Sequence, residues 1–108
     1  MERDLIRRDR FGTIGFLAPE ALVGFKKIDY KVDTWSLGVL LFLMISGELP
    51  FNGSELQIKQ QTLKKDIKFD DPIWENYSPA ALDLISNLLR KDCNHRLTLN
   101  EILDHQWL

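Results

Sequence analysis

The sequence predicts an all-α domain in which amphipathic helices surround one central apolar helix, at about residues 33–46. Three observations lead to this prediction. Residues 37–45 form the longest apolar run, and in a helix they would present apolar side chains in every direction. Helix-capping patterns recur further along the chain. No stretch shows the alternation of apolar and polar residues that is typical of a half-buried strand.

The composition is that of an ordinary globular domain. The chain has 108 residues, of which 44% are hydrophobic and 28% charged, and this balance argues against disorder. The net charge of -2 gives no electrostatic basis for binding nucleic acid or an anionic membrane. The apolar run is about half as long as a membrane span. The single cysteine, Cys93, excludes a disulfide within the chain and fits a reducing compartment, so we expect a cytoplasmic or nuclear protein.

The first elements along the chain are a charged, unpatterned segment at residues 1–11, a loop with glycines as far as Leu17, and a short helix. This helix is predicted to begin at Pro19, because the first helical turn does not need the N–H that proline lacks. Gly24 is predicted to end it.

The central helix is predicted to have Asp33 as its N-cap, to continue to Ser46 and to stop at Gly47. A helix that is apolar on all sides has to be covered by protein. We therefore expect other segments or a partner to pack all around it.

Three amphipathic helices are expected after the central one, with a loop at residues 69–77. One of them begins at Ser78, which is followed by proline. The other two begin with a capping box, formed by Ser54 with Gln57 and by Thr98 with Glu101. The apolar residues predicted on the inner faces of the last two helices are Leu82, Ile85, Leu88, Leu89, Ile102, Leu103 and Trp107.

Residue types that carry catalysis or bind metals do not form a recognisable pattern. The spacing of Cys93, His95 and His105 fits no tetrahedral zinc site, and neither histidine belongs to a recognised catalytic triad. The six glycines form neither GxGxxG nor GxxxxGK, the loops that bind phosphate through backbone N–H groups. The residues alone therefore predict no catalytic group, no metal and no bound cofactor.

Four short motifs follow one another along the chain: GTIGFLAPE at residues 12–20, DTWSLGV at 33–39, GELPF at 47–51 and NHRLT at 94–98. Together they resemble the serine/threonine protein kinase family, in which such motifs stand in the same order. GTIGFLAPE at residues 12–20 resembles the end of a kinase activation segment, which closes with Ala-Pro-Glu. DTWSLGV at residues 33–39 is similar to the start of the central helix of the kinase helical lobe, and GELPF at 47–51 to the turn after it. NHRLT at residues 94–98 resembles the arginine segment that precedes the last helix.

The resemblance covers nearly the whole chain. At residues 41–44 and 105–107 the sequence is most similar to the calcium/calmodulin-dependent group of kinases. It implies one partial kinase domain at residues 1–108. Within it, residues 1–20 would be the end of the activation segment with the substrate loop, and residues 21–108 the helical subdomain.

The resemblance also implies substrate-binding roles. Thr13 corresponds to a threonine that hydrogen-bonds to the catalytic loop of a kinase. The residues that follow it correspond to the wall that receives the substrate residue after the phosphoacceptor; they are Ile14, Gly15, Phe16 and Leu17.

Five further residues would have structural roles. Glu20 and Arg96 correspond to a buried salt bridge that ties the substrate loop to the helical subdomain. A buried carboxylate without its guanidinium would cost roughly 3–5 kcal/mol, which makes this pairing physically reasonable. Asp33 resembles the aspartate that anchors the catalytic loop, and Trp35 and Gly38 belong to the same motif of the central helix.

The parts of the family that handle the nucleotide have no counterpart in the 108 residues: the glycine-rich loop, the strand lysine and its helix glutamate, and the HRD and DFG motifs. Kinases use these parts to position ATP, magnesium and the attacking hydroxyl. We therefore expect ATP and magnesium to be cofactors of the family only, and the chain alone to be inactive.

Two interpretations that derive the chain from a kinase remain open. In the first, the chain is part of a longer kinase that acts on a protein or peptide substrate. In the second, it is a non-catalytic module derived from a kinase that docks other proteins. An unrelated all-α scaffold would be a third. The apolar central helix favours the first, and it predicts binding to the remaining kinase segment or self-association through exposed apolar surface.

Overall fold

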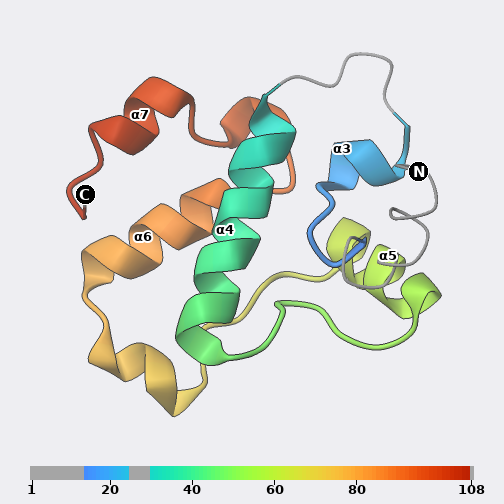
Figure 1. Ribbon diagram of the computed structural model, residues 1–108, viewed down its shortest axis with the longest axis horizontal. Helices are drawn as coiled ribbons and strands as arrows, with labels where there is room; N and C mark the ends of the chain where they lie inside the picture. Colours follow the sequence, from blue (N-terminus) through green and yellow to red (C-terminus); the bar gives the residue numbers. More distant parts are fainter. Residues whose placement is uncertain (1–13, 25–29, 108) are drawn as a thin grey trace, which may run out of the picture.

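The computed structural model describes residues 14–24 and 30–107, and these residues are helical without any strand (Figure 1). The predicted all-α class is therefore confirmed. In chain order the elements are α3 (Pro19–Leu22), α4 (Lys31–Ser46), α5 (Glu55–Lys64), η1 (Pro72–Asn76), α6 (Pro79–Leu88), η2 (Cys93–His95) and α7 (Leu99–Leu103).

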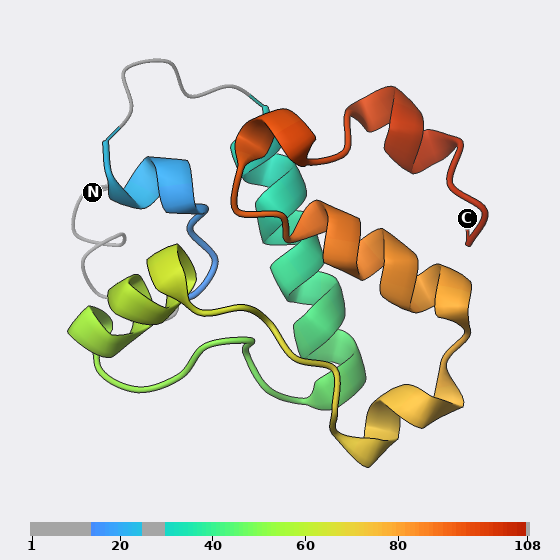
Figure 2. The same ribbon diagram turned by 180° about the vertical axis from the view of Figure 1, so that it is seen from behind.

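The long helix α4 crosses the middle of the molecule. In Figures 1 and 2, α3 and α5 lie on one side of it, and α6 and α7 lie on the other. Its C-terminus matches the prediction: Gly47 has a left-handed φ of 78°, and its N–H donates to the Leu43 carbonyl at 2.8 Å.

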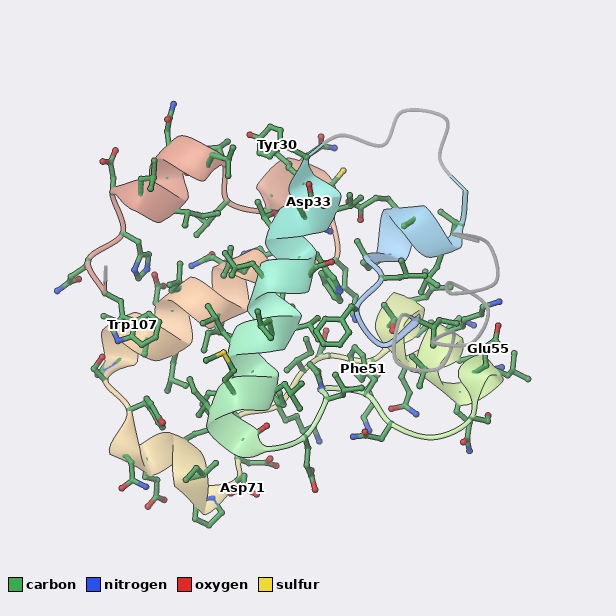
Figure 3. All side chains as sticks on the ribbon, viewed as in Figure 1. Tyr30, Asp33, Phe51, Glu55, Asp71 and Trp107 are labelled. Carbon is green, nitrogen blue, oxygen red and sulfur yellow. The ribbon has the colours of Figure 1, made fainter. Side chains whose placement is uncertain are left out.

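The predicted start of α4 is wrong. The helix begins at Lys31 with Tyr30 as its N-cap, and Asp33 lies in the first turn instead of capping it (Figure 3). The backbone N–H of Asp33 already donates to the Tyr30 carbonyl at 2.9 Å. An acidic residue in the first turn is still favourable, because its charge opposes the positive end of the helix dipole.

The core lies where α4 meets α6 and η1. Residues 69–77, predicted as a loop, contain the 3₁₀ helix η1, which places Trp74 in the core. The ring of Trp74 lies 4.9 Å from those of Phe42 and Phe69, centroid to centroid. The buried residues of the main cluster are Ala18, Trp35, Val39, Phe42, Trp74, Ile85 and Leu89. A second cluster joins α6 to α7 through Leu84, Leu88 and Ile102.

Gly38 allows α4 and α6 to approach closely. A Cβ atom at this position would lie 2.8 Å from Cβ of Leu88 and 2.9 Å from Cγ of Leu89. Both distances are shorter than real carbon contacts, so any larger residue would force the two helices apart.

Both predicted capping boxes are present. The Ser54 hydroxyl accepts from the Gln57 N–H at 3.2 Å, and the Gln57 side chain accepts from the Ser54 N–H at 2.8 Å. Thr98 and Glu101 repeat the arrangement at the start of α7. Hydrogen bonds from Thr98, first from its backbone and then from its side chain, lower the pKa of the Glu101 carboxyl.

The prediction of which apolar residues the last helix buries is only partly correct. Ile102 is buried, but Leu103 is 74% exposed and Trp107 lies beyond the end of α7. The turn after α7 is instead held by His105, whose Nε2 lies 2.8 Å from an Asp83 carboxylate oxygen on α6. Its Nδ1 accepts from the Trp107 N–H at 3.1 Å.

One face of α4 is not covered by the described residues. Leu37, Leu40 and Met44 are spaced along this face and are all exposed, Met44 by 72%. We refer to these three residues as the α4 stripe. The expectation that α4 is covered on every side is therefore not met within the part of the chain that the structure describes.

Candidate functional site

The segment that precedes α3 is fixed at both of its ends. Ile14 is buried, and its carbonyl accepts from the Leu17 N–H at 3.2 Å, which closes a turn over Gly15 and Phe16. Ala18 follows the turn and is almost fully buried in the main core cluster. The segment is therefore held against the core at both ends, and the residues between them, 15–17, are half-buried.

A serine on α4 adds a second attachment. The Ser36 hydroxyl lies 2.9 Å from the Phe16 carbonyl and 3.1 Å from the Val32 carbonyl one helical turn earlier. Because the hydroxyl has one proton, it donates to one of these oxygens at a time. The contact joins the backbone of the segment directly to the central helix.

A buried ion pair joins α3 to the segment that precedes α7. Nη1 of Arg96 lies 2.6 Å from one carboxylate oxygen of Glu20, and Nη2 lies 2.9 Å from the other. The exposed fraction is 5% for Glu20 and 2% for Arg96. This bidentate geometry is the strong form of an arginine–carboxylate contact.

Arg96 also donates to three backbone carbonyls: Arg90 at 2.9 Å, Lys31 at 2.7 Å and Lys91 at 3.4 Å. Its guanidinium carbon lies 5.2 Å from the centre of the Trp35 ring, within the range of a cation–π contact. Arg96 therefore connects α3, the start of α4 and the segment that follows α6. Among the described residues, no buried side-chain nitrogen or oxygen lacks a hydrogen-bond partner.

Lys91 is a second cation at this junction, and sequence reasoning did not identify it. Its Nζ donates to the Thr62 carbonyl at 2.7 Å and lies 4.8 Å from the centre of the Phe51 ring. Burial lowers the pKa of Lys91, and the nearby Asp66 carboxylate acts in the opposite direction. The ammonium group holds the C-terminal end of α5, where carbonyl oxygens lack helical partners.

The expected site residues do not all come together. Ile14, Gly15, Phe16 and Leu17 form one continuous segment beside α3, and Glu20, Arg96 and Trp35 meet at the junction behind it. Asp33 is exposed on the first turn of α4 (Figure 3). Thr13 lies outside the described residues. Ser36 and Lys91 were missed, because their bonds to distant carbonyls leave no signal in the local sequence.

The described residues do not fit an ATP–magnesium site. Within residues 14–24 and 30–107, no group of three or more His, Cys, Asp or Glu could hold a metal ion. The glycines with positive φ in these ranges, Gly24, Gly47 and Gly53, stand singly and do not form a phosphate-binding loop. No helix in the described part of the chain is long and apolar enough to cross a membrane.

Comparison with known protein families shows which family the chain is related to. The model of the protein kinase domain matches residues 2–108. The chain belongs to the protein kinase family. More specifically, it corresponds to the C-terminal, helical part of a serine/threonine protein kinase domain, with relatives in the calcium/calmodulin-dependent group.

Curated serine/threonine kinases match nearly the whole chain. It is 36% identical to mouse serine/threonine-protein kinase 33 (Mus musculus) over 90% of its length. It is 38% identical to the smooth-muscle myosin light chain kinase of Gallus gallus over 91% of its length. A calcium and calcium/calmodulin-dependent serine/threonine-protein kinase of Lilium longiflorum is 39% identical over 91%. The chain spans only 20%, 5% and 19% of these three proteins.

Solved kinase structures have the same fold. The twitchin kinase region of C. elegans matches with a TM-score of 0.84 and 37% identity, over 90% of this chain and 17% of that one. A twitchin kinase fragment with immunoglobulin domains matches with a TM-score of 0.82 and 36% identity, over 89% and 22%. The arrangement of helices around α4 is therefore a kinase arrangement.

Proposed function

We propose that the chain supplies the substrate-facing wall and the helical scaffold of a kinase that transfers phosphate from ATP to serine or threonine in a protein. The observation that supports this proposal is the buried Glu20–Arg96 pair, which attaches α3 and the segment before it to the core. In this role, Ile14 to Leu17 receive the substrate residue that follows the phosphoacceptor. Thr13 and Asp33 contact the catalytic loop of the same kinase domain.

We also propose that these 108 residues alone neither bind ATP nor transfer phosphate. The family places nucleotide and magnesium on motifs that this sequence does not contain. Residues 1–20 would then be the end of an activation segment, and residues 21–108 its supporting subdomain. Calorimetric titration of the 108-residue polypeptide with ATP and magnesium is expected to give no binding heat, and saturable binding would contradict this part of the proposal.

A chimeric kinase tests the catalytic assignment. The 99-residue segment of the smooth-muscle myosin light chain kinase that aligns with this chain would be replaced by the aligned part of this sequence. The chimera is expected to phosphorylate a serine-containing peptide, because the substrate wall and scaffold are supplied intact. Arg96→Ala in the chimera should abolish most of this activity, and the exposed Leu103→Asp should leave it unchanged.

The result also separates the two interpretations of the chain. A chimera that folds and binds ATP but transfers no phosphate would contradict a catalytic origin. It would favour a docking module that has kept the kinase fold without its function. ATP affinity is measured separately, so that a loss of nucleotide binding is not mistaken for a loss of the substrate wall.

The α4 stripe leads to a prediction about association. Because contiguous exposed apolar surface is rare on monomeric proteins, we expect the 108-residue polypeptide to self-associate through Leu37, Leu40 and Met44. In a longer kinase, other segments of the domain would cover the same residues. Sedimentation velocity should show oligomers that Met44→Lys dissociates, whereas Leu103→Lys on α7 should leave them intact. A monomeric wild-type polypeptide would count against the prediction.

A further inference from the structure

The turn that leads into α5 contains the pair Asn52-Gly53. The chain has five asparagines, and the other four are followed by tyrosine, leucine, histidine or glutamate. Because glycine has no side chain, the backbone nitrogen that follows Asn52 can approach the side-chain carbonyl carbon of Asn52 without hindrance. Both residues are exposed. The pair is therefore open to water and to ring closure by its own backbone.

The structure requires glycine at position 53. Its φ of 123° is one that other residues rarely adopt, and an added Cβ would lie 3.1 Å from Cδ of Gln57 and still closer to the amide oxygen bonded to it. That oxygen accepts from the Ser54 N–H at 2.8 Å in the capping box of α5. A larger residue would therefore disturb the cap. The fold thus keeps beside Asn52 the residue that leaves its side chain least shielded.

The peptide group between Asn52 and Gly53 is favourably placed to lose its proton. Among the residues that the structure describes, none accepts a hydrogen bond from the Gly53 N–H. The carbonyl of the same peptide group, that of Asn52, accepts from Nε2 of Gln61 at 3.0 Å. When the nitrogen loses its proton, the negative charge is shared with this carbonyl oxygen, and a hydrogen bond to a charged acceptor is stronger than one to a neutral acceptor. Gln61 therefore stabilises the anion.

The side chain of Asn52 is attached to the same turn. Its Nδ2 donates to the Leu49 carbonyl at 2.9 Å. Because this bond is exposed to solvent, water can take the place of Nδ2 if that nitrogen leaves. The surroundings of Asn52 therefore do not protect its carboxamide.

We propose that Asn52 is a site of spontaneous deamidation in the folded chain, and that Gln61 is a positioning residue for the reaction. The Gly53 nitrogen gives its proton to hydroxide and forms a bond to Cγ of Asn52. The bond from Cγ to Nδ2 breaks, and this nitrogen takes a proton from water and leaves as ammonia. Water then opens the resulting succinimide at either carbonyl carbon, which gives aspartate or isoaspartate. Overall, one water is consumed and one ammonia is released, without oxidation or a cofactor.

Isoaspartate would change how α5 is attached, because it adds a methylene group to the main chain and a carboxylate beside it. The turn is held on both sides. Phe51 is buried, with Nζ of Lys91 4.8 Å from its ring centre, and Ser54 caps α5. Figure 3 shows Phe51 near the middle of the molecule and Glu55 at its edge. The added length would therefore move α5 relative to Phe51. This modification needs no phosphoryl transfer, so it stands apart from the proposed catalytic role.

The test follows the five asparagines of the 108-residue polypeptide by peptide mapping after incubation at neutral and at mildly alkaline pH. Mass spectrometry detects replacement of the side-chain amino group by hydroxyl, and an isoaspartyl methyltransferase with labelled S-adenosylmethionine detects isoaspartate. Asn52 is expected to react about tenfold faster than the other asparagines, with a rate that rises with hydroxide concentration. Asn52→Gln should abolish the methylation, because glutamine would have to close a larger ring.

Two variants on α5 test the role of Gln61. Gln61→Leu should slow the reaction about fivefold, the effect of losing one hydrogen bond. Gln60→Leu makes the same change at the neighbouring exposed position and should leave the rate unchanged. Melting curves establish that both variants are folded, and in concentrated urea Gln61→Leu and the wild type should react equally fast.

The two parts of the proposal can fail separately. If Asn52 in the folded chain reacts no faster than the other asparagines, it is not a deamidation site. If Gln61→Leu reacts as fast as the wild type or faster in the folded state, Gln61 does not promote the reaction.

Discussion

Replacing Arg96 with alanine is expected to lower the free energy of unfolding by about 3–5 kcal/mol, the range found when one partner of a buried ion pair is removed. Glu20 would keep its buried charge and lose hydrogen bonds of 2.6 and 2.9 Å. Three backbone carbonyls would also lose a donor. Since small domains are stable by only about 5–15 kcal/mol, urea denaturation followed by circular dichroism should detect the change clearly.

Arg90→Ala is the matched control for this experiment. Arg90 is also an arginine but is exposed, and its side chain donates to Asn87 at 3.0 Å. Removing it should cost less than about 1 kcal/mol. The double variant Glu20→Leu with Arg96→Met should be more stable than Arg96→Ala, because it leaves no unpaired buried charge. Equal stability of the Arg96→Ala and Arg90→Ala variants would show that the buried pair contributes little.

Replacing Gly38 with valine is expected to lower the free energy of unfolding by about 3 kcal/mol, at the upper end of the cost of overpacking. The first added carbon would already lie 2.8 Å from Leu88 and 2.9 Å from Leu89, so α4 and α6 would have to separate. Gly38→Ala should cost less, because alanine favours a helix over glycine by about 1 kcal/mol and offsets part of the strain. Thermal unfolding of the two variants beside the wild type provides the comparison.

A control and a second-site change support this experiment. Leu103→Val introduces valine at an exposed position of α7, away from the α4 stripe, and should change stability by about 0.5 kcal/mol or less. Leu89→Ala removes two of the three nearest atoms at Gly38. Leu89→Ala should therefore lower the free energy of unfolding by about 1 kcal/mol less in the Gly38→Val variant than in the wild type. Strictly additive effects would mean that the clash at Gly38 is relieved elsewhere.

Local signals predict much of this fold. The capping boxes at Ser54 and Thr98 depend on residues three apart, so they can be recognised in the sequence and are found in the structure. The stop at Gly47 depends on one left-handed residue. The start of α4 could not be found in this way, because Lys31 is held by distant partners. Its Nζ donates to the Cys93 carbonyl at 3.0 Å, and its own carbonyl accepts from Arg96 at 2.7 Å.

The contacts of the site are harder to predict from the sequence than the fold. No spacing rule relates Glu20 to Arg96, and their pairing was expected only from the resemblance to kinases. Trp74 reaches the core through a 3₁₀ helix, although residues 69–77, which include Pro72, were predicted as a loop. Lys91 and Ser36 bond to backbone carbonyls, which every residue possesses, so no residue type in the sequence marks their partners.

The separation between Glu20 and Arg96 has a consequence during synthesis on the ribosome. The two residues lie 76 positions apart, and chains grow at about 5–20 residues per second, so roughly 4–15 s pass between the addition of the acid and of its partner. During that interval Glu20 cannot be buried at its final position without a large cost. The nascent α3 therefore stays in contact with water until Arg96 has been added. Slower translation between these two codons would lengthen the exposure of the unassembled apolar helix α4.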